Sequence, residues 1–429
     1  MKHSRLVPLL AVSTLLFVAA ALWAPGGAHR VGPTLANTSA NHGAAPAGDP
    51  SSLIPPSARG RAGGAKFGQP TIVGIQGTGF EEDLRLDSQD RVFTSVPASL
   101  SSGTSWIWRS QDHGKTFKWI PAAAPLTGKL PTCAGGGDTE LGVDSADHLY
   151  FNDLTLVNFS TARSDDHGQT MIPGDCQSVT TTPDDRQWYA FDGDPTNGGS
   201  MYLVYDIVGL GPPQCGASNG NNTLVMARSP ADPTLGATAG NVFAPSQFVT
   251  DPTQCAEGIM GNDEVSPTTH HIFVVHDDAL FHSVSMGRCV AVPFTTDPRG
   301  LTCTDHLIAN LGAGFRTGGS FPTMAIDKAG NLYAVWEQAP VNASDQITGD
   351  TMLKWSSSSD EGNHWTTPVT IPTPGLHNNV MAWPAAGDPG RVDIALASIA
   401  KRLNAESVPT AHGGLRWYPS TIRKVLQAA

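Results

Sequence analysis

The sequence predicts an all-β protein, a six-bladed β-propeller. Three observations predict this fold: a pattern of two short strands recurs six times, turn-forming residues are abundant, and no segment has helical periodicity of useful length. The 46 glycines and 33 prolines supply the turns that many short strands require. A β-sandwich is the alternative architecture, but a sandwich does not need a repeat of fixed length.

Each repeat has an apolar strand, a tight turn and a second strand, which in most copies carries Tyr or Phe. The clearest copies are LRLDSQDRVFTSV, LGVDSADHLYFNDL and TMAIDKAGNLYAVWE, which begin at residues 84, 141 and 323. Equivalent positions follow one another at intervals of 57, 52, 71, 60 and 60 residues, at Phe93, Tyr150, Tyr202, Phe273, Tyr333 and Asp393. Units of this length hold about four short strands, the content of one propeller blade.

The two ends of the chain differ from the repeats. Residues 1–28 have an early positive charge, an apolar run and small residues, and we expect them to be a secretory signal peptide, with an uncleaved membrane anchor as the alternative. Residues 29–68 are rich in Ala, Gly, Pro and Ser and are expected to form a flexible linker. The propeller then spans residues 69–429, with residues 70–75 (PTIVGI) completing the last blade. The segment from Lys401 onward contains few strand signals and leaves the completeness of that blade open.

Composition narrows the classes of partner. The net charge is −12 and no run of Lys or Arg occurs, which argues against a nucleic-acid or anionic-membrane surface. We therefore expect a secreted or cell-surface monomer whose partner is an extracellular glycan or a surface protein, with no membrane insertion beyond the signal segment.

The six cysteines form an even set in an exported chain, which favours disulfides. Their places in neighbouring loops, or in one hairpin, predict three pairs: Cys133 with Cys176, Cys215 with Cys255, and Cys289 with Cys303.

A second motif, Ser-x-Asp-x-Gly, occurs in SQDHGKTF, SDDHGQTM and SSDEGNHW. In a hairpin turn the Asp can accept backbone N–H bonds and the Gly can adopt positive φ, so this spacing indicates a structural device. The residues concerned are Asp112, Gly114, Asp166, Gly168, Asp360 and Gly362.

These three copies resemble the Asp box, or bacterial neuraminidase repeat, of the sialidase-like β-propellers. The resemblance covers residues 70 to about 400 and implies a propeller of sialidase type with an exo-glycosidase (glycoside hydrolase) activity on extracellular glycans. Asp boxes also occur in non-enzymatic propellers. The alternative is therefore a non-catalytic propeller that binds glycans or proteins at the cell surface.

Propeller topology places the turn after each first strand and the Asp box at one end, so function is expected at the opposite end. Many acids fall on the loops and strand ends expected there: Glu81, Glu82, Asp83, Asp138, Glu140, Asp153, Asp184, Asp185, Asp206, Glu257, Asp263, Glu264, Asp277 and Glu337. Because glycoside hydrolysis uses two carboxyl groups with separated pKa values, the catalytic candidates are Asp138, Asp185 and Glu264. The substrate-binding candidates are Arg186, Arg316, Trp188, Tyr189 and Trp336.

Each candidate also has a structural interpretation: the acids can cap turns, Asp185 and Arg186 can form an ion pair, and the aromatic rings can pack between blades. The resemblance further implies a Tyr–Glu nucleophile pair and three arginines that hold a substrate carboxylate, but the string from Phe315 to Gly318 lacks the Ile-Pro of the family motif. No organic cofactor is expected. Calcium is a further candidate ligand because Asp oxygens suit a hard cation, although no contiguous Asp-x-Asp-x-Asp loop is present.

Overall fold

The computed structural model describes residues 83–97, 105–120, 136–154, 159–177, 183–211, 222–230, 243–318, 320–373 and 379–398, together with Val73 and Cys215. These residues all belong to one compact unit, residues 68–417. The predicted signal peptide, the linker and the segment from Lys401 lie outside the described residues, as does the predicted closing strand apart from Val73.

The all-β prediction is confirmed. The described residues form strands β1 to β23 and contain no α-helix, and thus no helix of a length and apolarity that would cross a membrane. The strands form six antiparallel sheets, which we number 1 to 6 in chain order.

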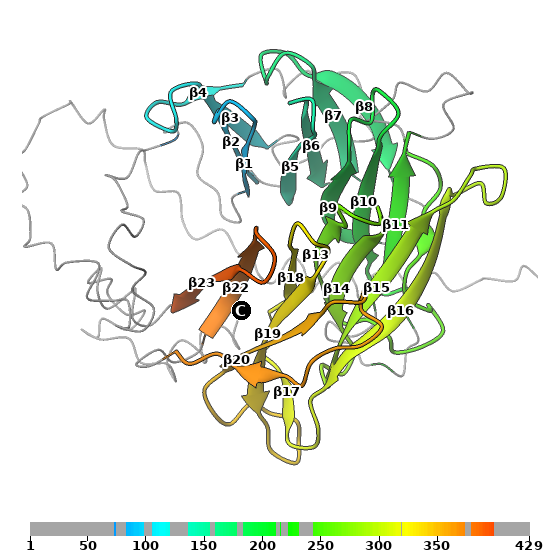
Figure 1. The fold of residues 1–429 in the computed structure, drawn as a ribbon, viewed down its shortest axis with the longest axis vertical. Helices are drawn as coiled ribbons and strands as arrows, with labels where there is room; N and C mark the ends of the chain where they lie inside the picture. The colour runs from blue at the N-terminus through cyan, green and yellow to red at the C-terminus, as the bar shows by residue number, and fades with distance from the viewer. Residues whose placement is uncertain are drawn as a thin grey trace, which may run out of the picture. The chain divides into compact units, whose positions relative to one another are not determined.

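Sheets 1 to 3 are four-stranded and follow one another along the chain (Figure 1). Sheet 1 contains β1 (Asp83–Leu86), β2 (Val92–Val96), β3 (Trp106–Ser110) and β4 (Lys118–Trp119). Sheet 2 contains β5 (Thr139–Val143), β6 (Leu149–Leu154), β7 (Phe159–Ser164) and β8 (Ile172–Gln177). Sheet 3 contains β9 (Asp184–Asp192), β10 (Ser200–Ile207), β11 (Thr223–Ser229) and β12 (Gln247–Phe248).

Sheets 4 to 6 continue this order, with one added strand in sheet 5 and two described strands in sheet 6. Sheet 4 contains β13 (Met260–Val265), β14 (Ile272–Asp277), β15 (Ser283–Ala291) and β16 (Leu301–Asn310). Sheet 5 contains β17 (Phe315–Thr317), β18 (Thr323–Ile326), β19 (Leu332–Pro340), β20 (Met352–Ser358) and β21 (Val369–Thr370). Sheet 6 contains β22 (Asn379–Ala386) and β23 (Val392–Ser398).

Apolar cores lie between consecutive sheets. One cluster joins sheets 1 and 2, a second joins sheets 2 and 3, and three more continue in the same way to sheet 6. In the cluster between sheets 1 and 2, for example, Phe93 and Ile107 of sheet 1 are buried with Leu149 and Phe151 of sheet 2. Each sheet from 2 to 5 therefore buries both of its faces, which is why its middle strands are almost continuously buried.

The first strands of the sheets meet one another in chain order: β1 contacts β5, β5 contacts β9, β9 contacts β13, β13 contacts β18, and β18 contacts β22. Asn262 of β13 fastens one of these contacts, because its side chain accepts a hydrogen bond from the Met324 amide (2.8 Å) and donates one to the Met324 carbonyl (2.9 Å). This alignment turns the first strands toward a common cavity.

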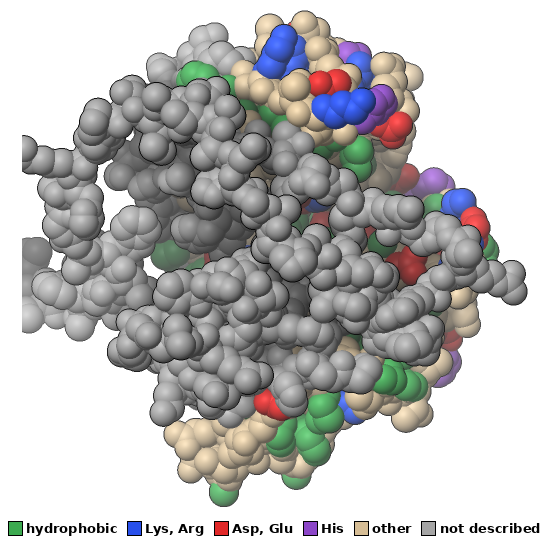
Figure 2. Space-filling view, turned by 90° about the vertical axis from the view of Figure 1, so that its left-hand side faces the viewer, with side chains coloured by type: hydrophobic (Ala, Val, Ile, Leu, Met, Phe, Trp, Pro, Cys, Tyr) green, Lys and Arg blue, Asp and Glu red, His purple; other side chains and the backbone are tan. Residues whose placement is uncertain are grey.

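Turns between first and second strands use one repeated device. Asp87, Asp144 and Asp327 each accept hydrogen bonds from the backbone N–H groups two and four residues further on, at 2.9–3.0 Å. Neighbouring turns are also linked, since the Ser88 amide donates to Asp147 at 2.8 Å. Figure 2 shows positively and negatively charged side chains close together at the upper edge of the molecule.

The three Ser-x-Asp-x-Gly turns share a second device. In each, the Ser hydroxyl donates to the Asp carboxylate (2.7–2.9 Å) and accepts the Gly N–H (2.8–2.9 Å), while the Asp accepts the amide four residues on. Gly114, Gly168 and Gly362 have φ of 76° to 79°. Arg91 of the first turn contacts His167 of a Ser-x-Asp-x-Gly turn at 2.7 Å, so the two kinds of turn lie at the same end, as the topology argument expects.

Two of the three predicted disulfides are confirmed: Cys215 with Cys255, and Cys289 with Cys303. The second joins paired positions of β15 and β16. For the third pair, Cys133 lies outside the described residues and the side chain of Cys176 is not described.

Substitution of Gly168 by Ala tests how tightly a turn packs on the core. Gly168 and Gly198 both have positive φ (76° and 87°), but only at Gly168 would a Cβ atom lie 3.0–3.2 Å from Phe93, Ile120 and Leu149. We expect Gly168→Ala to lower the free energy of unfolding by about 1–3 kcal/mol more than the control Gly198→Ala, because overpacking adds to the shared backbone strain. Urea unfolding of the two variants measures this difference, and equal losses would contradict the packing argument.

Candidate functional site

A cavity of about 770 Å³ lies among the first strands of the sheets. Its walls come from β1, β5, β9, β13 and β22 and from the segments that precede β5 and β18. The charged lining residues are Asp83, Arg85, Asp138, Glu140, Arg186, Asp263 and Glu264. Carboxyl groups outnumber guanidinium groups, so the described part of the wall is acidic.

Arg85 neutralises one part of this wall. Its guanidinium donates to Asp83 at 2.9 Å and to Glu140 at 2.8 Å. Asp83 also accepts the Leu141 amide at 2.7 Å, which ties β1 to β5. Burial raises the pKa of Glu140 well above its usual range, although Arg85 opposes that shift. Arg85, Asp83 and Glu140 therefore form one hydrogen-bonded charge network on this part of the wall.

Asp138 and Asp185 form a carboxyl pair at the boundary between sheets 2 and 3. Burial, and after it the neighbouring Asp138 carboxyl, raises the pKa of Asp185 to about 6, and the two side chains share a hydrogen bond. The backbone supports this contact, since Gln187 donates to the Asp138 carbonyl at 2.7 Å. The singly protonated form of such a pair is favoured over the doubly ionised form, because two ionised carboxylates repel each other.

Arg186 follows this pair with φ of +56°, a conformation that side-chain-bearing residues adopt infrequently. Its guanidinium lies over the ring of Phe321, 4.4 Å from the centroid, in a cation–π contact. Arg186 therefore does not form the predicted ion pair with Asp185. Its guanidinium contacts Phe321 on the cavity wall instead, and its charge lowers the pKa of Asp185 only from a longer distance.

Glu264 and Asp263 contribute two further acids from β13. Burial, followed by the charge of Asp263, raises the pKa of Glu264 to about 8. Burial raises the pKa of Asp263 to about 7. Asn262 donates a hydrogen bond to Glu264 at 3.3 Å, and the same amide is held by β18. Glu264 is therefore a carboxylic acid at neutral pH on a rigid strand.

Aromatic rings form the apolar part of the wall. Trp188 meets Phe321 edge-on with centroids 5.4 Å apart, and Trp383 at 6.1 Å. Trp383 keeps 44% of its surface exposed. An exposed indole beside carboxyl groups is a surface on which a sugar ring can stack while its hydroxyl groups form hydrogen bonds.

The remaining predicted binding residues lie elsewhere or face inward. The structure does not bring Arg316 to the cavity: it lies on β17, over the ring of Phe281 at 4.6 Å and 3.2 Å from Asp345. Trp336 is 1% exposed in the core between sheets 4 and 5, where packing explains it. Tyr189 contacts the cavity but is only 6% exposed and belongs to the core between sheets 2 and 3.

Arg85, Phe321 and Trp383 are cavity residues that the sequence prediction missed as binding candidates. Arg85 and Trp383 each lie on the first strand of a repeat unit. Aligning the first strands of all six units would have indicated both positions.

Carboxylates at the ends of the second strands hold loops. Asp153 accepts hydrogen bonds from the Gly136 amide (2.7 Å) and from the amide and hydroxyl of Ser105 (2.9 and 2.8 Å). Asp277 accepts the Ile259 amide at 2.9 Å and the Thr317 hydroxyl at 2.7 Å. Asp153 and Asp277 therefore hold the neighbouring loops in place, as the structural interpretation of the acids predicts.

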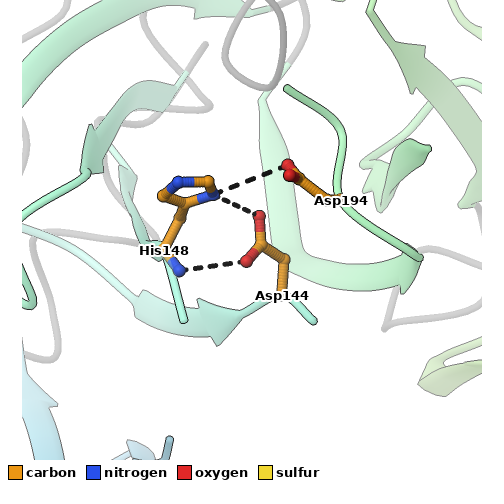
Figure 3. A group of neighbouring side chains, drawn as sticks. All are labelled: Asp144, His148 and Asp194. Carbon is orange, nitrogen blue, oxygen red and sulfur yellow. Dashed lines mark hydrogen bonds and ion pairs between the residues drawn. The ribbon is translucent and has the colours of Figure 1, made fainter. Parts of the chain in front are cut away.

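Asp144, His148 and Asp194 form a separate group of potential metal ligands (Figure 3). One ring nitrogen of His148 lies 2.8 Å from Asp144 and 3.6 Å from Asp194. Both Asp144 oxygens already have partners: Oδ1 accepts two backbone amides and Oδ2 accepts the Tyr150 hydroxyl at 3.0 Å. We interpret this group as a bridge between sheets 2 and 3 that continues the turn device described above.

No protein-family model and no curated protein matches this chain. Among solved structures, it is similar to an α-L-arabinanase from Penicillium chrysogenum complexed with arabinobiose (13% identity, TM-score 0.41, 74% of this chain and 92% of that chain). It is also similar to an α-L-arabinofuranosidase from Fusarium graminearum in complex with an iminosugar inhibitor (12% identity, TM-score 0.41, 75% and 93%). A Hadza microbial sialidase matches at 12% identity and a TM-score of 0.39, over 74% and 65%. These values are too low to transfer a function, which must be inferred from the cavity.

The raised pKa values predict that the protein is most stable in mild acid. Asp185, Asp263 and Glu264, with pKa values of about 6, 7 and 8, keep protons that the unfolded chain has released above about pH 4.5. We therefore expect the free energy of unfolding to fall as the pH rises from about 5 to about 8, as urea titrations at several pH values can measure.

Glu264→Gln is the matched variant for this prediction. It removes one titrating proton, so the slope of stability against pH should become shallower by up to about 1.4 kcal/mol per pH unit. A wild-type curve that is flat or rises between these pH values would contradict the assignment.

Proposed function

We propose that the chain is an exported, six-bladed propeller of the glycoside hydrolase type, which removes terminal neutral sugars from extracellular glycans. The observation that carries this proposal is the cavity, which is lined by carboxyl groups from sheets 1, 2 and 4 together with the exposed indole of Trp383. Its volume of about 770 Å³ lies in the usual range for small-molecule sites and suits one or two sugar rings. The two disulfides support export, because such bonds persist in oxidising compartments.

The acids divide into two roles. Glu264, protonated at neutral pH, is the proposed general acid that donates its proton to the glycosidic oxygen as the bond to the anomeric carbon breaks. The Asp138–Asp185 pair supplies a carboxylate on the neighbouring wall, as the base that takes a proton from water or as the nucleophile. Carboxyl groups whose environments separate their pKa values are the usual basis of this chemistry.

The charge of the cavity favours a neutral sugar over a sialic acid. Arg316 lies away from the cavity, and Arg85 is already paired with Asp83 and Glu140. Among the described lining residues, only Arg186 could then bind a substrate carboxylate. The sialidase resemblance implies three guanidinium groups for that purpose.

A panel of aryl glycosides tests the activity. We expect the purified protein to hydrolyse a neutral glycoside, and Glu264→Gln to lower kcat/KM by about 10²- to 10⁴-fold, since the variant keeps the shape but lacks the proton. Asp388→Asn is the control, because Asp388 pairs with Lys328 on the surface. Hydrolysis of a sialoside alone would contradict the neutral substrate, and glycan binding without hydrolysis of any glycoside would favour the non-catalytic alternative.

Trp383→Ala tests the stacking surface. We expect it to weaken glycan binding by roughly tenfold, which corresponds to about 1–1.5 kcal/mol of lost stacking, while Trp119→Ala leaves binding unchanged. The two indoles are equally exposed, at 44%, but Trp119 lies on the fourth strand of sheet 1. Calorimetric titration with an oligosaccharide that the panel identifies measures both, and equal losses would contradict the proposed platform.

A further inference from the structure

A pair of buried carboxyl groups lies at the boundary between sheets 3 and 4, apart from the residues that line the cavity. Asp206 is the second-last residue of β10 in sheet 3, and Glu257 precedes β13 of sheet 4. Each is 1% exposed, and the two carboxyl groups are within hydrogen-bonding distance of each other. Neither contributes to the acid–base chemistry proposed above.

Apart from the hydrogen bond that the two carboxyl groups can share, three oxygens of this pair have no hydrogen-bond partner among the described residues: Oδ1 of Asp206 and both carboxyl oxygens of Glu257. The carboxyl groups of Asp185 and Asp277 add further negative charge nearby, and the guanidinium of Arg186 opposes it. A buried carboxylate without donors is unfavourable unless a proton or a cation neutralises it. One shared proton would join two of the three oxygens and leave the third without a partner.

The loop that carries Glu257 cannot move away to relieve this repulsion. The Cys215–Cys255 disulfide anchors it two residues earlier. Immediately after it, the Gly258 amide donates to the Asp277 carbonyl at 2.9 Å, and Asn222 donates to the Gly258 carbonyl at 2.8 Å. A Cβ atom on Gly258 would lie 2.4 Å from the Asp278 carbonyl oxygen, so the backbones are in close contact. The unpartnered oxygens are thus held in place by both sheets.

We infer that Asp206 and Glu257 bind a divalent, oxygen-preferring cation, Ca²⁺ in the first instance, which joins sheets 3 and 4. Carboxylate oxygens are the ligands that Ca²⁺ prefers, and a carboxylate can bind it through one oxygen or both, so the unpartnered oxygens of Asp206 and Glu257 are suitable ligands for such an ion. Asp144 differs from this pair, because both of its carboxyl oxygens already accept hydrogen bonds.

Thermal unfolding of the intact mature protein, first freed of metal with a chelator, tests this inference without reference to glycosidase activity. At about pH 8, where proton competition is weakest, added CaCl₂ should raise Tm in a saturable way. The expected rise is roughly 4 °C at a concentration about 100 times the dissociation constant. Calorimetric titration should give one ion per chain.

Glu257→Gln separates the cation from a shared proton. Without calcium this variant should be at least as stable as the wild type, because it removes a buried charge, but it should lose the rise in Tm with CaCl₂; Asp206→Asn should behave in the same way. Asp251→Asn, in the same loop, is the control that keeps the rise, since Asp251 caps a turn through Thr253. The inference is overturned if CaCl₂ leaves the wild-type Tm unchanged, or if Glu257→Gln keeps the full response.

Discussion

The structure depends on one constraint: each middle sheet must bury both faces against its neighbours while its first strand remains open to the cavity. Successive side chains of β9 show how this is met, since Tyr189 enters the core between sheets 2 and 3 and Ala190 the core between sheets 3 and 4. Because a strand alternates its side chains between two apolar faces, polar groups are confined to its ends and to the edge that faces the cavity. Acidic residues therefore gather where the first strands begin and the second strands end.

These acids are all removed from water to some degree, and they differ in the hydrogen-bond partners that surround them. Asp153 and Asp277 meet backbone and hydroxyl donors and hold loops. Asp83 and Glu140 meet the guanidinium of Arg85. Glu264 meets one weak amide donor, and burial raises its pKa to about 8. Burial raises the pKa of Asp277 to about 8 as well, so the position of Glu264 on the cavity wall, and not its pKa alone, distinguishes it from the acids that hold loops.

The strand repeat and the turn devices could be predicted from the sequence because they are local: Asp87 and Asp327, for example, bond to residues at most four positions away. The cavity could be predicted only in part. Asp138, Arg186, Trp188 and Glu264 were placed on it by repeat topology. Arg316 was misplaced because residues 315–317 form β17, an added strand that pairs with β19 beyond the end of β18. Trp383 was missed because its role depends on contacts between first strands of different sheets, which are non-local.

The short fourth strands have a consequence for behaviour in solution. β4, β12 and β21 contain two residues each, so sheets 1, 3 and 5 end in an outer edge with few free backbone groups. The fourth strand of sheet 4, β16, is ten residues long, but seven of its side chains are exposed or half-buried in the sequence LTCTDHLIAN, with Asp305 and His306 in the middle. Edges that are very short or carry charge are poor templates for strand addition from another molecule. The outer rim of these sheets is thereby protected against self-association by strand pairing.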